Sequence, residues 1–113
     1  MSDQITLLVE SNISDGKLDE LLAVVARLKA HVAKTEPDTL QYDWFIDADN
    51  NTARVVEVYA SSDAVLFHAQ NYASFAKELA SLRTVASMSV CGTPSSALAD
   101  AFSKAGAKFY APV

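Results

Sequence analysis

The stretch from Val55 to Asn71 constrains the fold more than any other part of this chain. It begins with a β-branched run that ends at Tyr59, and such a run predicts a strand. Residues 61–63, Ser-Ser-Asp, follow, and each can cap a helix by accepting a hydrogen bond from a free backbone N–H. The helix expected next carries His68, one of two histidines in the chain. Because the strand leads directly into a capped helix, the position of this histidine relative to the sheet is expected to be fixed.

The remaining pattern predicts further strands and helices, with a break in the second helix near Asn71 and Tyr72. Thr93 before Pro94 is the expected cap of a third, short helix, which Gly106 can end. The expected strands are residues 5–10, 39–47, 54–60 and 84–91; the first helix is 18–32, the second spans 64–82 with its break, and the tail from residue 108 is an edge strand or an arm.

This β-α-β-β-α-β order predicts an α+β fold, the ferredoxin-like split βαβ, with a C-terminal α-β extension. Both main helices are expected on one face of a four-stranded antiparallel sheet. Alternation assigns these residues to the covered face: Ile5, Leu7, Val9, Leu40, Tyr42, Trp44, Ile46, Val56, Val58, Met88 and Val90. The other face mixes polar residues with Leu8, Phe45, Val55 and Tyr59, which is more typical of a partner surface than of a solvated face. We therefore expect a homodimer.

Length and composition indicate one domain and exclude several classes of function. The 113 residues, half of them hydrophobic, suffice for one core, with residues 1–91 as the ferredoxin-like part and 92–113 as the extension. The net charge is −5 and the nine Lys and Arg residues are scattered, which argues against nucleic acid or an anionic membrane as partner. Three glycines outside any GxGxxG pattern argue against a dinucleotide fold.

Cysteine, histidine and hydropathy patterns restrict the remaining possibilities. The single cysteine, Cys91, rules out an intramolecular disulfide, and it is expected to act as a small hydrophobe. Two well-separated histidines and one cysteine give no compact metal-ligand spacing, so no metal is expected. No stretch approaches the ~20 apolar residues of a membrane helix, and the first residues lack signal-peptide character, so a cytoplasmic protein is expected.

Two blocks of the sequence resemble a known family. Residues 36–42 read Glu-Pro-Asp-Thr-Leu-Gln-Tyr, and residues 57–61 read Glu-Val-Tyr-Ala-Ser, followed by His68 and Phe75. Their order and spacing resemble the antibiotic biosynthesis monooxygenase family, dimeric α+β barrels that include quinol and anthrone oxygenases. Residues 92–112 resemble the tail of some quinol-monooxygenase-like members.

The resemblance implies a cofactor-free monooxygenase that oxidises a quinol-like or polycyclic aromatic substrate with O2. The chain departs from the family at Tyr59, where Trp is more usual. Members that degrade haem carry an Asn and a His at positions that here match Ser11 and the vicinity of Glu78, so haem breakdown is not implied.

His68 is the candidate catalytic residue. In cofactor-free oxygenation a base removes a proton from a phenol or an activated C–H, and the resulting anion gives an electron to O2. A neutral imidazole suits that task near pH 7. The alternative is a half-buried histidine that only hydrogen-bonds the sheet or a neighbouring loop.

The candidate substrate pocket is aromatic. Tyr42, Trp44 and Phe75 can stack a flat substrate, although such residues are often simply core. The hydroxyls of Tyr59 and Tyr72 can hold a substrate oxygen. Asn71 can do so with its amide, or it can be a helix-breaking cap.

Two further polar residues are expected to have non-catalytic roles. Glu57 is expected to pair with a charge across the dimer interface more than to act in catalysis, and His31 is expected to be solvated. Besides the monooxygenase, two functions stay open: a non-catalytic ligand-binding or stress-associated dimer, and a structural module whose dimer surface is its function.

Overall fold

A computed structural model describes residues 3–113 of the chain. The elements, in chain order, are β1 (Ile5–Ile13), α1 (Leu18–Thr35), β2 (Thr39–Asp47), β3 (Thr52–Tyr59), α2 (Ser62–Ala80), β4 (Arg83–Cys91), α3 (Ser96–Lys104) and β5 (Lys108–Tyr110). The expected order of strands and helices is therefore confirmed, with β1 three residues longer than its hydrophobic pattern indicates.

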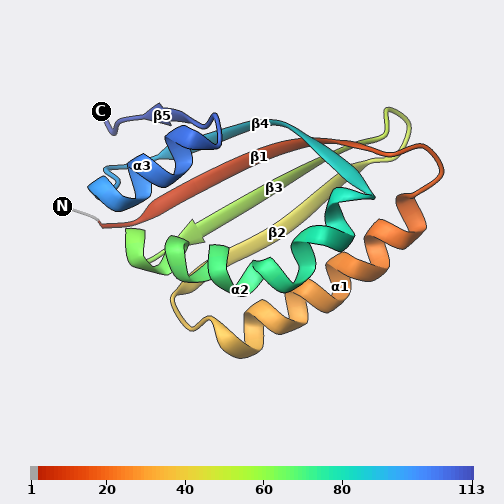
Figure 1. Cartoon of the computed structure of the whole chain (residues 1–113), viewed down its shortest axis with the longest axis horizontal. Coiled ribbons are helices and arrows are strands. Elements are labelled where there is room, and N and C mark those ends of the chain that lie inside the picture. The colour runs from red at the N-terminus through yellow and green to blue at the C-terminus, as the bar shows by residue number, and fades with distance from the viewer. Residues whose placement is uncertain (1–2) are drawn as a thin grey trace.

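The strands form one sheet in the order β2-β3-β1-β4-β5 (Figure 1). The first four pair antiparallel, as the ferredoxin-like split βαβ requires. The tail adds β5 parallel to the edge of β4, and Phe109 lies opposite Val90. The tail is therefore an edge strand and not a free arm.

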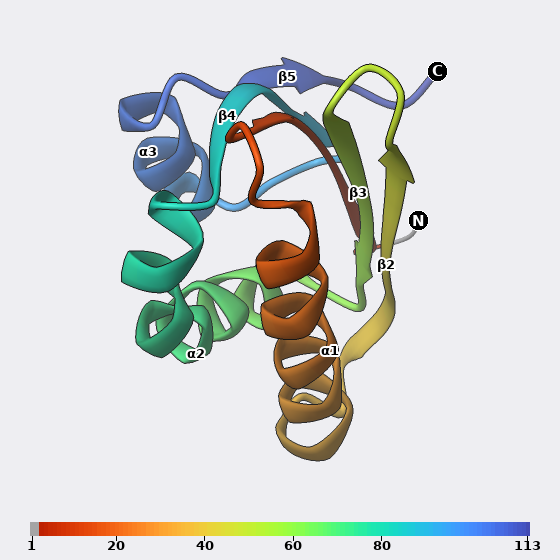
Figure 2. The same ribbon diagram turned by 90° about the vertical axis from the view of Figure 1, so that its right-hand side faces the viewer.

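Helices α1 and α2 cover one face of the sheet, and among residues 3–113 no helix covers the opposite face (Figure 2). The amphipathic stripe of α1, with Leu21 and Leu28 fully buried, packs on the sheet beside Leu79 of α2. A second buried cluster at the other end of the sheet joins Ile5 and Tyr59 to Leu98 of α3. The extension thus packs against its own chain.

The inward and outward faces of β3 are the reverse of the sequence prediction. Val55, Glu57 and Tyr59 are buried beneath the helices, whereas Val56 and Val58 lie on the uncovered face. Alternation alone could not decide between the faces because valine occupies both of them. Of the four apolar residues expected on the uncovered face, Leu8 and Phe45 are exposed there, at 42% and 57%.

Leu40 is also misplaced by simple alternation. It is 53% exposed, and the register between β2 and β3 shifts between Thr39 and Gln41. Such an irregularity breaks the period of two, so a residue before it cannot be assigned from the residues after it. Tyr42, Trp44 and Ile46, beyond the shift, do pack on the core.

The helix ends show one confirmed cap and two corrections. Ser61 caps α2, because its Oγ accepts a hydrogen bond from the backbone N–H of Ala64 at 3.2 Å. The expected break at Asn71 and Tyr72 was wrong, since α2 continues through both residues. The cap of α3 is Ser95 and not Thr93, and its Oγ accepts from Leu98 N at 3.2 Å.

Gly92 makes the turn from β4 into the extension. Its φ of +131° is a conformation that residues with a side chain disfavour, and a Cβ there would lie 2.8 Å from the backbone oxygen of Gln4.

Within residues 3–113, no helix combines the length and the hydropathy needed to cross a bilayer.

Candidate active site

A cavity of about 230 Å³ lies between the sheet and the α2 helix, and α3 contributes one wall. Most of its lining is apolar. The residues that line it are Leu7, Val9, Tyr42, Trp44, Val55, Glu57, His68, Ala69, Tyr72, Arg83, Val85, Met88 and Phe102. An apolar cavity with a few convergent polar groups is the usual form of a small-molecule site.

Regular spacing on three elements brings the polar groups together. His68 and Tyr72 are four residues apart on α2 and therefore share one helix face. Tyr42 and Trp44 are two apart on β2 and therefore share one sheet face. Phe102 reaches the cavity from α3, so the C-terminal extension forms part of the site.

His68 is buried, with 7% of its surface exposed, and its two ring nitrogens have different surroundings. Nδ1 lies 2.8 Å from Oε1 and 3.1 Å from Oε2 of Glu36. Nε2 lies 3.7 Å from Oε1 of Glu57, beyond hydrogen-bond distance. We assign the Nδ1–H tautomer from these partners, which leaves the Nε2 lone pair on the cavity side, available as a base.

Glu36 directly follows α1 and is 4% exposed. Besides the bond from His68, its carboxylate accepts a hydrogen bond from Asn71 Nδ2 at 2.7 Å and one from Thr39 Oγ1 at 2.7 Å. Three donors directed at one carboxylate satisfy a buried charge that would otherwise be costly.

The network extends behind Glu36 to His31 and Thr35. The amide of Asn71 donates to Thr35 Oγ1 at 2.8 Å, and Asn71 Oδ1 lies 2.8 Å from His31 Nε2. His31 also contacts the ring of Phe75, with 5.6 Å between ring centroids. The expectation of a solvated His31 was therefore wrong, and Asn71 is a bonding residue within α2, not a helix-ending cap.

Glu57 faces the cavity and not a subunit interface, which corrects its expected place. It is 6% exposed, and the Tyr59 hydroxyl donates to its Oε1 at 2.5 Å. Burial raises the pKa of Glu57 above its ordinary value, while the Tyr59 hydrogen bond, His68 and Arg83 act in the opposite direction. A second titratable group thus lies beside His68.

Tyr42 is a phenol held in its protonated form. Burial raises its pKa above the ordinary value and the Glu57 carboxylate adds to this effect, while the neighbouring Trp44 and Arg83 oppose it. Its ring lies 5.1 Å from that of His68, centroid to centroid. A protonated phenol at this place can donate a hydrogen bond to an oxygen in the cavity.

Arg83 begins β4 and brings a positive charge to the cavity. Its guanidinium donates to Ser11 Oγ at 2.8 Å and to the Tyr72 hydroxyl at 3.1 Å, and it lies 5.2 Å from the centre of the Trp44 ring. Within residues 3–113 it forms no ion pair with a carboxylate. It can therefore attract an anion in the cavity.

Trp44 places a buried donor in the cavity wall. Its indole Nε1 is buried and, among the described residues, has no hydrogen-bond partner. Buried donors normally have partners, and the neighbouring Tyr42 hydroxyl, whose pKa Trp44 lowers, is an acceptor close to this N–H.

The structure separates the proposed site residues into two groups. His68, Tyr42, Trp44 and Tyr72 line the cavity. The others do not: Tyr59 lies behind Glu57, Asn71 holds Glu36, and Phe75 packs on His31.

Sequence reasoning missed Glu36, Arg83 and Phe102 as parts of this site. The signals in the sequence are weak: a glutamate before a proline, an arginine at the start of a strand, and an aromatic residue in the extension.

Among residues 3–113, no three His, Cys, Asp or Glu side chains are grouped so that they could hold a metal ion.

Solved structures share this fold. MupZ from Pseudomonas fluorescens is 19% identical, with a TM-score of 0.89, over 100% of this chain and 88% of that chain. SnoaB, a cofactor-independent oxygenase from Streptomyces nogalater, is 21% identical with a TM-score of 0.68 over 79% of this chain and 91% of that chain. A putative antibiotic biosynthesis monooxygenase from Bacteroides thetaiotaomicron is 16% identical, with a TM-score of 0.66, over 78% of this chain and 85% of that chain.

No curated protein matches this chain. The sequence profile described as "Antibiotic biosynthesis monooxygenase" matches residues 4–77, which include both sequence blocks and His68. The chain belongs to the antibiotic biosynthesis monooxygenase family.

Proposed function

We propose that this protein is a cofactor-free monooxygenase that oxidises a quinol-like or polycyclic aromatic substrate with O2. The observation that supports this most is the unbonded Nε2 of His68 in an aromatic cavity that also holds a guanidinium. SnoaB, which shares the fold, is described as a cofactor-independent oxygenase.

The first step is a proton transfer from a phenol or an activated C–H of the substrate to Nε2 of His68. The resulting anion is stabilised by the Arg83 guanidinium and by a hydrogen bond from the Tyr42 hydroxyl. The apolar walls strengthen both interactions because they exclude water. Trp44 and Tyr72 offer rings on which a flat substrate stacks.

The substrate supplies all the electrons for the reaction. Its anion reduces O2 by one electron, and recombination of the two radicals forms a carbon–oxygen bond. When a quinol becomes a hydroxyquinone, or a ring CH2 becomes a carbonyl, one oxygen atom enters the product, the other leaves as water, and two substrate hydrogens enter that water. The proton held on His68 Nε2 returns to the departing oxygen.

The cavity volume favours the smaller of the two substrate classes. About 230 Å³ lies below the ~300–1,000 Å³ typical of small-molecule pockets. A quinol of one or two rings therefore fits this site better than a larger polycyclic compound.

We also propose a homodimer in which two uncovered sheet faces meet. The support is the exposure of Leu8 and Phe45 on that face, next to the partly exposed Val56 and Val58. A non-catalytic dimer that only binds an aromatic ligand in the same cavity is the alternative function.

Oxygen consumption with a panel of hydroquinones, naphthohydroquinones and anthrones tests the proposal. The His68→Ala variant should lower the rate by at least ~100-fold, the usual size of an acid–base contribution. Gln70→Ala, an exposed change on the same helix, should not. If the wild type consumes no oxygen but a panel member raises its melting temperature, the ligand-binding alternative replaces the enzyme.

A further inference from the structure

We propose that Glu36 is the positioning residue of the cavity's base: its carboxylate fixes the Nδ1–H tautomer of His68, and the same residue borders a separate groove on the outside of the molecule. This inference rests on the proposed function for its kinetic consequences, but not for its structural ones. It assigns a role to the glutamate that directly follows α1.

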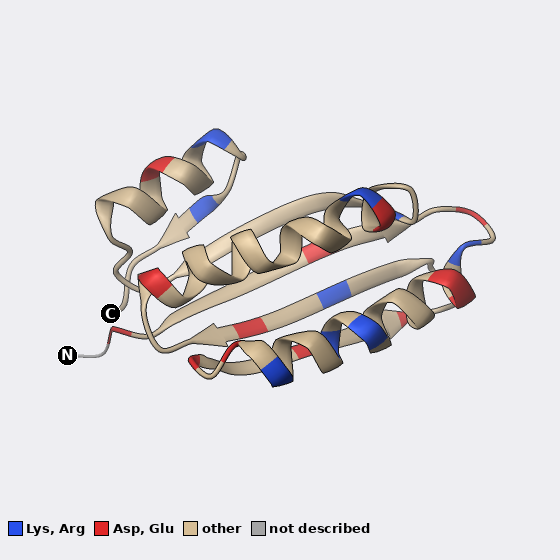
Figure 3. Cartoon of the chain, turned by 60° about the horizontal axis from the view of Figure 1, so that its bottom comes forward, with Lys and Arg blue, Asp and Glu red and all other residues tan. Residues whose placement is uncertain are grey.

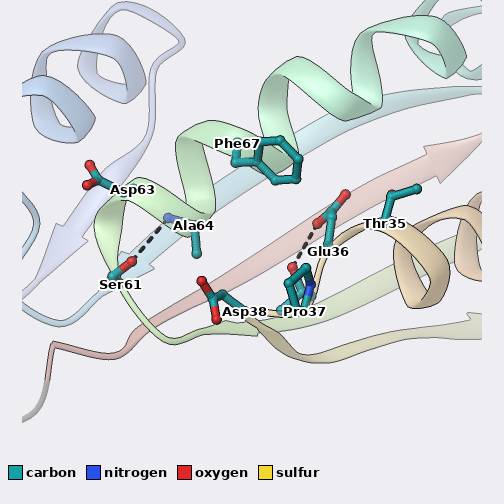
Figure 4. Close-up of a pocket in the computed structure, with 9 residues that line it drawn as sticks. Thr35, Glu36, Pro37, Asp38, Ser61, Asp63, Ala64 and Phe67 are labelled. Atoms are coloured by element: carbon teal, nitrogen blue, oxygen red, sulfur yellow. Dashed lines mark hydrogen bonds between the residues drawn. The ribbon is translucent and has the colours of Figure 1, made fainter.

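The outer groove, of about 340 Å³, lies where the turn between α1 and β2 meets the start of α2. Figure 4 shows Glu36 extending from the turn toward α2, with Phe67 above it and Ser61 and Asp38 along the rim. The residues that line the groove are Thr35, Glu36, Pro37, Asp38, Thr39, Ser61, Asp63, Ala64 and Phe67. Figure 3 shows acidic positions at the start of α2 and in the α1–β2 turn, the two segments whose residues line this groove.

Glu36 and His68 together form the wall between this groove and the cavity. Glu36 lines the groove and His68 lines the cavity, and the 2.8 Å contact between Nδ1 and Oε1 joins them. Glu36 thus borders the outer groove although only 1% of its side chain is exposed, while the imidazole of His68 borders the cavity.

The surroundings of Glu36 suit a fixed, ionised acceptor. Thr39 donates to Oε1 and Asn71 to Oε2, so both oxygens are held before His68 adds its bond. A carboxylate held in this way accepts a hydrogen bond from Nδ1–H of His68 in a fixed direction. An imidazole with Nδ1–H bound in this way presents its Nε2 lone pair in one direction.

Glu57 does not serve this purpose. Its Oε1 lies 3.7 Å from His68 Nε2, too far for a hydrogen bond, and is already bonded by Tyr59. If Nε2 carried a proton and donated it in a hydrogen bond to Glu57, it would lack the lone pair that the reaction needs. Glu36 alone among the two buried glutamates therefore orients the base.

Nitrogen NMR of histidine-labelled protein tests the tautomer without any substrate. Wild-type His68 should show a protonated Nδ1 and a pyridine-like Nε2, and His68→Ala identifies its signals by their loss. In Glu36→Gln the two tautomers should mix. A wild-type His68 with its proton on Nε2 overturns the inference, whatever the enzyme's activity.

Kinetics with a quinol that the wild type consumes test the catalytic consequence. Glu36→Gln should lower kcat by at least ~10-fold with little change in KM, because orientation of a base acts on the transition state. Glu36→Ala should regain activity with added formate, which can enter from the groove, and not with chloride. Asp38→Asn, a change in the same groove without contact to His68, is the matched control and should keep wild-type activity.

The NMR and kinetic experiments together distinguish a failure of the proposed function from a failure of the role proposed for Glu36. If no compound is oxidised, the proposed function fails while the NMR result still decides the role of Glu36. If Glu36→Gln keeps both the wild-type kcat and the wild-type tautomer, Glu36 only stabilises the fold and the inference is wrong. Melting temperatures of the variants establish that each is folded.

Discussion

His68 Nδ1 lies 2.8 Å from Glu36 Oε1, although the two residues are 32 positions apart in the sequence. The contact joins the turn after α1 to the first half of α2, and both side chains are buried. Because Asn71 and Thr39 donate to the same carboxylate, the two helices and β2 are tied together at one point. The hydrogen bonds that hold His68 in the candidate site therefore also hold α1, α2 and β2 against one another.

Glu57→Gln should stabilise the protein at neutral pH. Burial raises the pKa of Glu57 in the folded state, so its protonated form contributes stability that is complete below the unfolded value of about 4.3 and is lost as the pH rises through the folded value. A glutamine cannot ionise, so Glu57→Gln should be more stable than the wild type at pH 7.5, and the difference should vanish near pH 4. Urea unfolding at both pH values measures it.

The control for this prediction is Asp100→Asn, which alters an exposed carboxyl on α3 and should show no such pH dependence. Lower stability of Glu57→Gln than of the wild type at pH 7.5 would show that the ionised carboxylate is favourable in its site.

Phe102→Ala should widen the cavity and change substrate preference. The ring lines the cavity from α3, so its removal adds space at that wall. The ratio of kcat/KM for a three-ring anthrone to that for a one-ring hydroquinone should rise by at least ~10-fold, a change of about 1.4 kcal/mol. Phe67→Ala, which removes a half-exposed ring outside the cavity, should leave the ratio unchanged.

Phe45→Asp should convert a dimer to monomers. Phe45 is 57% exposed on the uncovered sheet face, where a buried charge would oppose an interface of at least ~1,000 Å². Light scattering after size exclusion should give twice the monomer mass for the wild type and the monomer mass for the variant. Leu22→Asp, on the exposed side of α1, should remain dimeric, and a monomeric wild type would refute the proposed interface.

Leu98→Ala should lower the free energy of unfolding by about 2–5 kcal/mol, as for other fully buried leucines. Leu98 has no exposed surface and joins α3 to the cluster of Ile5 and Tyr59. Thermal unfolding measures the loss, and Leu40→Ala, at a position 53% exposed, should cost far less. An unchanged melting temperature of Leu98→Ala would mean that α3 contributes little to the fold.

The sequence predicts the elements and their order because each strand and helix carries its own period. It fails on the faces of β3, where valines occupy both sides and the buried residues Glu57 and Tyr59 are polar. Glu57 faces inward to border the cavity, and Tyr59 faces the same way because its hydroxyl donates a hydrogen bond to Glu57. Local hydropathy does not contain that information.

The same limit applies to the site. His68 was identifiable as an isolated histidine on a capped helix, and the aromatic residues of β2 as an inward-facing pair. Glu36 and Arg83 become functional only through contacts with residues distant in the sequence. Asn71 appeared to be a helix breaker because its amide partners, Thr35 and Glu36, lie on another element.

The short strand β5 has a consequence for self-association. It pairs with β4 only over Ser89 to Cys91, at the edge of the sheet. An unpaired edge offers free N–H and C=O groups to any other extended chain, and natural proteins block such edges with short strands and lysines. β5 is three residues long and begins at the exposed Lys108, so it has both of these protective features. Proteolytic loss of the last residues would therefore open a template for intermolecular strand pairing, and aggregation of the clipped chain would precede its unfolding.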